Sequence, residues 1–305
     1  MAISRKTFTA LAAGLTLACL TTAPALAQTV TQPTLEKIKA SGKAVLGVRE
    51  TSPPMAYALG ANEKYVGYHV ELCERVLKEI APDAKLEYMA VTAQNTLPLV
   101  QNGTLDIGCG PTTNNTARQQ QVAFAVTTYV SEVRMAVRKD SDLKSINQLA
   151  GRTIAASTGT TAVQLLRKQE RVRGGAPIKT VLGKDHHESF LLLESGRADA
   201  FVLDDNLLAG MIANSKDPSA FRIVGEPLGA EPIALLFRKD DPTFKAAVDG
   251  VLTKLMQSGE MEKIYTKWFV NPIPPKQMSL SLPLGTTLRQ LFATPNDKPL
   301  ETYQQ

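Results

Sequence analysis

The residues best suited to bind a small anion lie between Gly108 and Arg118, directly after the apolar run 105–107. Glycine and proline shape the backbone of this stretch, and its threonine hydroxyls and backbone N–H groups can donate hydrogen bonds. A guanidinium can hold a carboxylate through two parallel hydrogen bonds. The stretch therefore predicts an anion pocket at the end of a strand, with Arg118 as its anchor. The alternative is an ordinary strand-to-helix loop that carries a solvated arginine.

The common catalytic, metal-binding and nucleotide-binding motifs are missing from the sequence. It contains no Gly-x-Ser-x-Gly, His-Glu-x-x-His, phosphate-loop Gly-Lys-Ser/Thr or Cys-x-x-Cys. His69, His186 and His187 lack the supporting acids or cysteines of a metal site. The net charge of +5 is mild, and no basic run with interleaved aromatic residues occurs. We therefore expect a protein that needs no cofactor and binds no nucleic acid.

Short apolar runs alternate with helical periodicity along most of the chain. Apolar residues recur at helical spacing from Val70 to Ile80, and again between Asp241-Pro242 and Gly259. This alternation predicts an α/β fold with largely parallel sheets. The runs expected to form strands are 44–48, 86–91, 105–108, 133–137, 153–156, 200–203 and 233–237.

The first residues have the pattern of a secretory signal peptide. Arg5 and Lys6 precede the apolar run 8–20, which is too short to span a bilayer and is followed by Ala25-Leu26-Ala27. We therefore expect residues 1–27 to be a signal peptide cleaved after Ala27. Cys19 raises the alternative of a lipoprotein anchor, but Thr16 stands where such an anchor needs an aliphatic residue.

No later apolar stretch approaches the ~20 residues of a membrane helix, so we expect the mature chain to lie outside the cytoplasm. It keeps two cysteines, Cys73 and Cys109, which could form a disulfide in an oxidising compartment. Cys73 also lies at a core position of a predicted helix, where a small buried thiol is common. The sequence leaves open whether the two residues pair.

The stretch 108–118, together with residues 122–125 and Tyr129 behind it, resembles the periplasmic amino-acid-binding proteins of ABC transporters. Within that group the resemblance is closest to the glutamate/aspartate-binding branch. Further matching stretches follow in the same order and cover essentially the whole chain after the first thirty or so residues. They are 47–50, 99–103, 112–115, 157–161, 184–186, 193–198, 203–205 and 267–275.

The resemblance implies a two-lobed periplasmic binding protein of type II, in which each lobe is a central β-sheet flanked by helices. The chain would cross between the lobes near 128–132 and again near 228–232, and two such crossings form a hinge. Lobe 1 would comprise residues 34–128 and 233–281, and lobe 2 residues 132–229. The C-terminal tail, 282–305, would pack along the outside or be partly disordered.

By the same resemblance, lobe 1 holds the α-carboxylate and part of the α-ammonium of an amino acid. Arg118 would hold the carboxylate, and Thr113 would add its hydroxyl and its backbone N–H. The carbonyl of Pro111 would face the ammonium. Proline has no N–H and stands where the family often has serine or glycine, so this part of the ammonium site depends on the carbonyl alone.

Lobe 2 would complete the site from the ends of two strands. Thr158 and Thr161 open a predicted helix, whose N-terminal N–H groups suit an anion, and both are implied contacts of the α-carboxylate. Asp204 closes the strand 200–203 and matches the ammonium-binding aspartate of the family. An acid at the carboxyl end of a strand is well placed for a ligand.

Arg49 and His186 match the cations that bind the side-chain carboxylate in the acidic branch. That branch carries a serine and a further arginine where this chain has Ala93 and Thr96. One expected cation is therefore missing, and we expect protonated His186 to contribute more than usual. Affinity for glutamate or aspartate would then weaken as the pH rises from about 5.5 to 8, because histidine loses its charge in this range.

The function implied is capture of an amino acid, in first place glutamate or aspartate, by closure of the lobes. The protein would be a periplasmic monomer that delivers its ligand to the membrane permease of an ABC transporter. A binding protein for another polar amino acid such as glutamine is one alternative. Others are a periplasmic dehydratase acting on prephenate or arogenate, whose scaffold is similar, and a sensor subunit that presents its ligand to a chemoreceptor.

Overall fold

The computed structural model describes residues 32–60, 64–173 and 176–303. The predicted signal peptide, with Thr16 and Cys19, lies outside these residues. The described residues from Pro33 onward form one compact unit. None of the helices in the described ranges has both the length and the apolar character that crossing a membrane requires.

Helices and strands alternate along the unit, as the sequence predicts. The α-helices are α1 (Thr34–Ser41), α2 (Tyr68–Ile80), α3 (Thr96–Gln101), α4 (Thr116–Gln119), α5 (Thr161–Arg173), α6 (His186–Glu194), α7 (Asp205–Asn214), α8 (Pro242–Gln257), α9 (Glu260–Phe269) and α10 (Thr286–Ala293). The strands are β1 (Lys43–Arg49), β2 (Thr51–Ser52), β3 (Ala56–Leu59), β4 (Lys64–Val66), β5 (Lys85–Val91), β6 (Ile107–Thr113), β7 (Val122–Phe124), β8 (Tyr129–Arg138), β9 (Thr153–Ser157), β10 (Lys179–Gly183), β11 (Ala200–Asp204), β12 (Phe221–Val224) and β13 (Ala230–Arg238). Short 3₁₀ helices are η1 (Ile146–Gln148), η2 (Pro218–Ala220) and η3 (Leu300–Thr302).

The main sheet has the strand order β10-β9-β11-β8-β13-β6-β1-β5, with β12 added to β8 and β7 to β13. The pairs β1–β5, β1–β6, β9–β10 and β9–β11 are parallel, as expected for strands joined by crossover helices. The central pairs are antiparallel, because β8 and β13 run in opposite directions to each other and to their other neighbours. The prediction of largely parallel sheets is therefore wrong for the middle of the sheet, since helical alternation gives no information about long strands that cross it.

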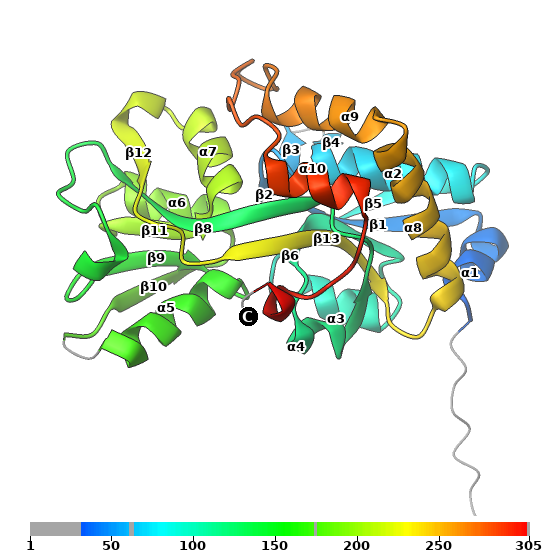
Figure 1. Cartoon of the computed structure of the whole chain (residues 1–305), viewed down its shortest axis with the longest axis horizontal. Helices are drawn as coiled ribbons and strands as arrows, with labels where there is room; N and C mark the ends of the chain where they lie inside the picture. The colour runs from blue at the N-terminus through cyan, green and yellow to red at the C-terminus, as the bar shows by residue number, and fades with distance from the viewer. Residues whose placement is uncertain (1–31, 61–63, 174–175, 304–305) are drawn as a thin grey trace, which may run out of the picture. The chain divides into compact units, whose positions relative to one another are not determined.

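Figure 1 shows two groups of helices in this unit, one with α5, α6 and α7 and the other with α2, α3, α8 and α9. The strands β8 and β13 run from one group to the other. They pair directly where the sequence places the crossings, with Tyr129 opposite Ile233 and Glu132 opposite Ala230. Beyond this segment, β8 continues into pairing with β11 and β12, and β13 into pairing with β6 and β7. The two strands therefore run through both halves of the sheet, and the hinge between two lobes stays a prediction.

The structure corrects the prediction of a loop after 105–108. The strand β6 runs on to Thr113 with every residue buried, and the loop begins only at Asn114. Its glycines serve close packing, because a Cβ on Gly108 would lie 2.5 Å from Leu236 and one on Gly110 would lie 2.3 Å from Arg49. A register shift in β13, between Ala234 and Leu236, lies opposite the segment of β6 that includes Pro111.

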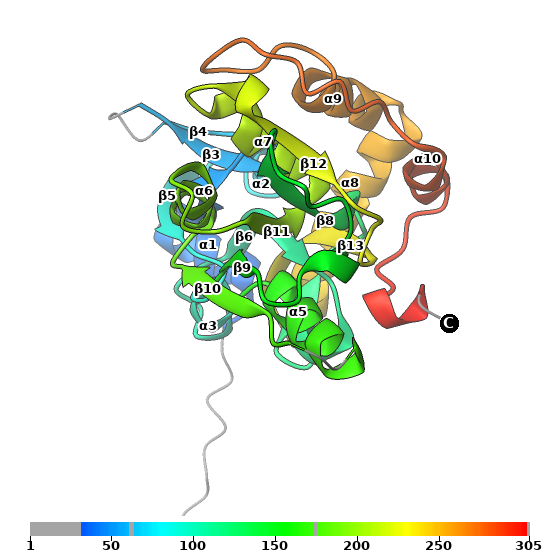
Figure 2. The same cartoon turned by 90° about the vertical axis from the view of Figure 1, so that its left-hand side faces the viewer.

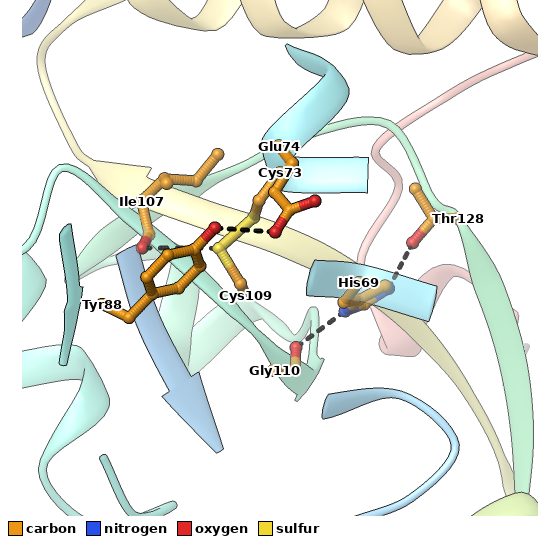
Figure 3. The surroundings of a disulfide bond; sticks show 8 residues. All are labelled: His69, Cys73, Glu74, Tyr88, Ile107, Cys109, Gly110 and Thr128. Carbon is orange, nitrogen blue, oxygen red and sulfur yellow. Dashed lines mark hydrogen bonds between the residues drawn. A yellow bond between two sulfur atoms is a disulfide. The ribbon is translucent and has the colours of Figure 1, made fainter. Parts of the chain in front are cut away.

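Cys73 and Cys109 form a disulfide, which answers the question that the sequence leaves open (Figure 3). The bond joins α2 to the site-bearing strand β6. One turn away on α2, buried His69 adds a second link: its Nδ1 lies 2.9 Å from the carbonyl oxygen of Gly110, and its Nε2 lies 2.8 Å from the hydroxyl of Thr128. The carbonyl can only accept, so Nδ1 donates. Burial lowers the pKa of His69 to about 4, so the ring is neutral and Nε2 accepts. The two links fix β6 relative to the start of β8.

The core residues of α2 and α8 agree with the predicted helical pattern. In α2, Val70, Cys73, Val76 and Leu77 are buried, whereas Ile80 is only partly buried. The helix α8 begins where the sequence indicates, because the side chain of Asp241 accepts a hydrogen bond from the backbone N–H of Phe244.

The C-terminal segment packs against the outside of the unit as far as residue 303. The helix α10 lies beside α8 (Figure 2) and also contacts β8. It buries Leu288, Leu291 and Phe292. Farther on, the carboxylate of Glu301 accepts hydrogen bonds from the backbone N–H and the hydroxyl of Thr116, the first residue of α4. The segment thereby supports the short helix that carries Arg118.

Removing the disulfide should lower the free energy of unfolding. The bond joins residues 36 positions apart. Because it limits the unfolded chain, the double variant Cys73→Ala/Cys109→Ala should lose about 2–4 kcal/mol of unfolding free energy in urea denaturation. Reducing agent should lower the stability of the wild type to a similar extent and leave the double variant unaffected. A loss below about 0.5 kcal/mol would show that the bond contributes little.

Candidate ligand-binding site

A cavity of about 20 Å³ brings together most of the residues predicted to bind the ligand. Seven of the eight predicted residues line it, and Thr158 does not. The lining residues are Arg49, Ala93, Pro111, Thr112, Thr113, Arg118, Thr160, Thr161, His186 and Asp204. A larger surface hollow of about 940 Å³ lies beside β10 and α6, and none of the eight predicted residues lines it.

The site is built from the carboxyl ends of strands and the first turns of helices, which is where α/β folds bind ligands. Arg49 and Asp204 are the last residues of β1 and β11, and Thr113 is the last residue of β6. Thr161 and His186 are the first residues of α5 and α6. The strand order therefore gathers residues that lie far apart in the sequence at one edge.

Arg49 and His186 form a buried pair in which the arginine donates. Arg49 Nη2 lies 2.9 Å from His186 Nε2, and His186 Nδ1 lies 2.8 Å from the hydroxyl oxygen of Ser157. A guanidinium has donors only, so Nε2 accepts from Arg49 and the ring proton must be on Nδ1, which donates to Ser157. The histidine is neutral in this arrangement.

The electrostatics of the pair agree with this assignment. Burial and the neighbouring charge of Arg49 hold the pKa of His186 well below its ordinary value of 6.5. Burial, together with the charge of Arg118, lowers the pKa of Arg49 to about 10, so Arg49 stays charged at neutral pH. The expectation that a protonated His186 supplies positive charge to the site is therefore wrong. The histidine instead orients Arg49.

The side chain of Arg118 contacts both the end of β6 and the turn before α5. Asn115 caps α4 by accepting a hydrogen bond from the backbone N–H of Arg118. The guanidinium donates to the carbonyl of Thr113 at 2.9 Å and to the carbonyl of Gly159, in the turn before α5, at 3.3 Å. These contacts place a half-buried cation at the end of β6, where the sequence predicts the anchor of the ligand.

Thr158 faces away from the cavity. Its backbone N–H and its hydroxyl both donate to the carbonyl of Gly183, at 2.9 and 3.0 Å, which ties the turn after β9 to β10. Thr160 lines the cavity in its place, and its hydroxyl donates to the carbonyl of Ser157. The predicted contact of Thr158 with a ligand carboxylate therefore does not fit the structure, since its hydroxyl proton points to β10.

Asp204 is the acidic side chain among the residues that line the cavity. Its Oδ1 accepts a hydrogen bond of 2.9 Å from the hydroxyl of Ser131 on β8. Burial and the nearby charge of Glu231 raise the pKa of Asp204 to about 8, although the hydrogen bond from Ser131 opposes this shift. A cation brought close to Asp204 would stabilise its ionised form.

Glu231 is a residue of the site that the sequence does not predict. It lies on β13, its side chain is buried, and its Oε2 accepts hydrogen bonds from the hydroxyls of Thr113 at 2.6 Å and Thr161 at 2.9 Å. Burial raises its pKa. The available signal in the sequence is an acid at the start of an apolar strand, inside the segment 228–232 that was expected to cross between the lobes.

Ala93 and Thr96, which differ from the serine and arginine of the acidic branch, occupy different positions relative to the cavity. Ala93 lines the cavity, whereas Thr96 is buried outside its lining and donates its hydroxyl to the carbonyl of Thr92 at 2.6 Å. The cationic side chains that line the cavity are Arg49 and Arg118. The positive charge available to an acidic ligand there therefore comes from these two arginines.

The fold and the site define a class of protein. Two arginines and a partly buried aspartate around one cavity suit a small ligand that carries both charges. A family model matches residues 44–271, and the chain belongs to that family, the bacterial extracellular solute-binding proteins, family 3.

The chain is 41% identical over 290 residues to the L-glutamate/L-aspartate-binding protein of Pseudomonas aeruginosa, covering 93% of this chain and 95% of the relative. It is 40% identical over 274 residues to the glutamate/aspartate import solute-binding protein of Salmonella typhimurium, covering 88% and 89%. The cysteine-binding protein of Campylobacter jejuni has a similar structure, with a TM-score of 0.69, 28% identity and coverage of 77% and 92%. These names describe binding and import proteins rather than dehydratases.

His186 should stay neutral through the pH range in which an exposed histidine titrates. Its lowered pKa and its hydrogen bond from Arg49 predict no change in the imidazole NMR signals of His186 between pH 5.5 and 8. The variant His186→Gln assigns these signals by their loss. A titration midpoint near 6.5 would contradict the donor assignment.

Asp204 should make the protein less stable as the pH rises. Its pKa is raised to about 8, so the folded state keeps a proton that the unfolded state releases near pH 4. This contribution to stability is complete below about pH 4 and is lost as the pH rises towards about 8. Urea denaturation at pH 4.5, 6 and 7.5 should therefore show a steeper decline for the wild type than for Asp204→Asn. Parallel declines would contradict the assignment.

Proposed function

We propose that this protein captures an acidic amino acid, glutamate or aspartate, in the periplasm and delivers it to the membrane permease of an ABC transporter. The observation that carries the proposal is the placement of Arg49, Arg118 and Asp204 around one cavity. The relatives that are about 40% identical support the ligand class, because their names specify glutamate and aspartate. We further propose that it acts as a monomer.

The charges of the cavity complement those of an acidic amino acid. Such a ligand has an α-carboxylate, an α-ammonium and a second carboxylate. Arg118 at the end of β6 would hold the α-carboxylate, and Asp204 would hold the ammonium. Arg49 would hold the side-chain carboxylate, with neutral His186 fixing the orientation of the guanidinium through their 2.9 Å hydrogen bond. Each contact is a charge-assisted hydrogen bond, about twice as strong as a neutral one.

Binding requires the cavity to open. A volume of about 20 Å³ accommodates roughly one water molecule, which is far too little for an amino acid. The contacts from Arg118 to Gly159 and from Arg49 to His186 would have to separate as the ligand enters. The paired segments of β8 and β13 would provide the hinge between lobe 1 (34–128 and 233–281) and lobe 2 (132–229).

Closure would then strengthen the contacts with the ligand. Expelling water lowers the effective dielectric constant around the two arginines and Asp204, so the same ion pairs become more favourable. The closed surface would be the form that the permease recognises. The ligand site itself would need no cofactor.

Titration calorimetry with purified protein tests the proposal. Glutamate or aspartate should bind more tightly than glutamine, and neither prephenate nor arogenate should be turned over. Tighter binding of glutamine at both pH 5.5 and pH 8 would contradict the acidic ligand and leave the transport function standing. Turnover of prephenate would contradict both.

Replacing Arg118 by alanine should weaken the binding of every α-amino acid. The α-carboxylate would lose a charge-assisted contact worth about 1.5–3 kcal/mol, which corresponds to roughly ten- to a hundredfold in affinity. Arg152→Ala is a matched control, because Arg152 is an exposed arginine paired with Asp142 away from the cavity. Calorimetry should show the loss for Arg118→Ala only. Binding within about fivefold of the wild type would mean that Arg118 is not the anchor.

A further inference from the structure

Glu231 connects the two sides of the candidate site through a single carboxylate oxygen. Its Oε2 accepts hydrogen bonds from Thr113, at the end of β6, and from Thr161, at the start of α5. Its other oxygen, Oε1, is buried and has no hydrogen-bond partner in the described part of the chain. The side chain is 1% exposed. A buried acid with this arrangement calls for an explanation.

The strand register places Glu231 on the same face of the sheet as Asp204. Glu231 lies opposite Ser131 in the pairing of β13 with β8, and Asp204 lies opposite Val133 in the pairing of β11 with β8. Ser131 and Val133 are two residues apart on one strand and therefore share a face. The hydroxyl of Ser131 donates to Asp204, so the two acids lie on either side of this serine.

The hydrogen bonds to Glu231 determine what the two threonines can offer a ligand. A hydroxyl has one proton to donate and two lone pairs to accept with. Because Oε2 accepts from both Thr113 and Thr161, both protons point at Glu231. This direction holds as long as Oε2 carries no proton, as in the ionised acid. The hydroxyl oxygens can then present only acceptor lone pairs to the cavity.

This arrangement does not fit the expected role of these hydroxyls as donors to an α-carboxylate. Two acceptor oxygens repel a carboxylate and attract an ammonium group, which has three N–H donors. Thr113 and Thr161 both line the cavity with Asp204, the acidic side chain of its lining. The hydroxyl groups and the aspartate therefore have the same preference for a cationic donor.

We propose that Glu231 is a positioning residue for amine recognition: it fixes the hydroxyls of Thr113 and Thr161 as acceptors for the α-ammonium of the ligand. The inference rests on the proposed function and assigns these two hydroxyls to the opposite end of the amino acid from the one the sequence implies. Glu231 acts through the threonines and does not touch the ligand. Since Thr113 and Thr161 come from the two proposed lobes, the arrangement is complete only when both lobes meet Glu231.

The variant Glu231→Gln tests the proposal with little change of shape. The amide presents a donor as well as an acceptor, so at least one hydroxyl can reverse its direction. Affinity is measured by calorimetry or competition for glutamate and for glutarate, which is glutamate without its amino group. Glutamate should bind about tenfold or more weakly to the variant, whereas glutarate should change by less than about threefold. Glu132→Gln, which removes an exposed acid from the neighbouring crossing strand, should change neither.

A second set of variants separates positioning from a purely structural role. Thr113→Val/Thr161→Val removes both hydroxyls and should lower the preference for glutamate over glutarate in the same direction. Adding Glu231→Gln to this double variant should have no further effect on the preference, because the groups through which it acts are gone. If Glu231→Gln fails to fold, the double variant alone decides the matter: an unchanged ratio of glutamate to glutarate affinity would overturn the proposal.

The outcomes distinguish this inference from the proposed function. Equal losses for glutamate and glutarate in Glu231→Gln, or no loss for either, would overturn the positioning role while the wild type still binds acidic amino acids. Failure of the wild type itself to bind any amino acid would overturn both. Thermal melts of each variant show whether a loss of affinity follows a loss of fold.

Discussion

The burial of opposite charges in one small cavity is the constraint on which the rest of the structure depends. Moving a charged group out of water costs several kcal/mol unless partners of opposite charge and hydrogen bonds offset it. The lowered pKa of Arg49 and the raised pKa of Asp204 both show this cost, because burial is the largest cause of each shift. Each of the two charged groups therefore has a hydrogen-bond partner. His186 accepts from Arg49, and Ser131 donates to Asp204.

The surrounding fold holds these groups in place through few but strong connections. The disulfide and the hydrogen bonds of His69 fix β6, which carries the candidate site between Pro111 and Thr113. The glycines of β6 allow the side chains of Arg49 and Leu236 to approach its backbone. On the other side, the pairing of β8 with β13 brings Asp204 and Glu231 to one face. A disulfide and hydrogen bonds therefore hold the β6 part of the site. The pairing of β8 with its neighbouring strands positions the two acids.

The sequence predicts part of this arrangement because some residues have a local signal that the resemblance to a family reinforces. Arg118 follows a glycine-rich strand end, and Asp204 ends an apolar run, so both are candidates from local pattern. The resemblance to a family supplies their roles and adds Arg49 and His186. The segments 128–132 and 228–232, where the sequence predicts the crossings, include most of the residues through which β8 pairs with β13.

The remaining features depend on contacts that local patterns do not encode. Glycine and proline in 108–113 suggest a loop, but the two glycines allow the close approach of Arg49 and Leu236 to a buried strand. The orientation of Thr158 depends on the carbonyl of Gly183, which is distant in sequence. The neutral state of His186 follows from burial beside Arg49, and the role of Glu231 follows from strand register. Each of these needs the three-dimensional arrangement.

A crystal structure of the protein grown with glutamate would test the central claim most directly. The account predicts glutamate in the cavity between β6 and α5, with its α-carboxylate on Arg118, its side-chain carboxylate on Arg49 and its ammonium on Asp204. The hydroxyls of Thr113 and Thr161 would still donate to Glu231. Glutamate bound in the reverse orientation, or outside this cavity altogether, would contradict the account.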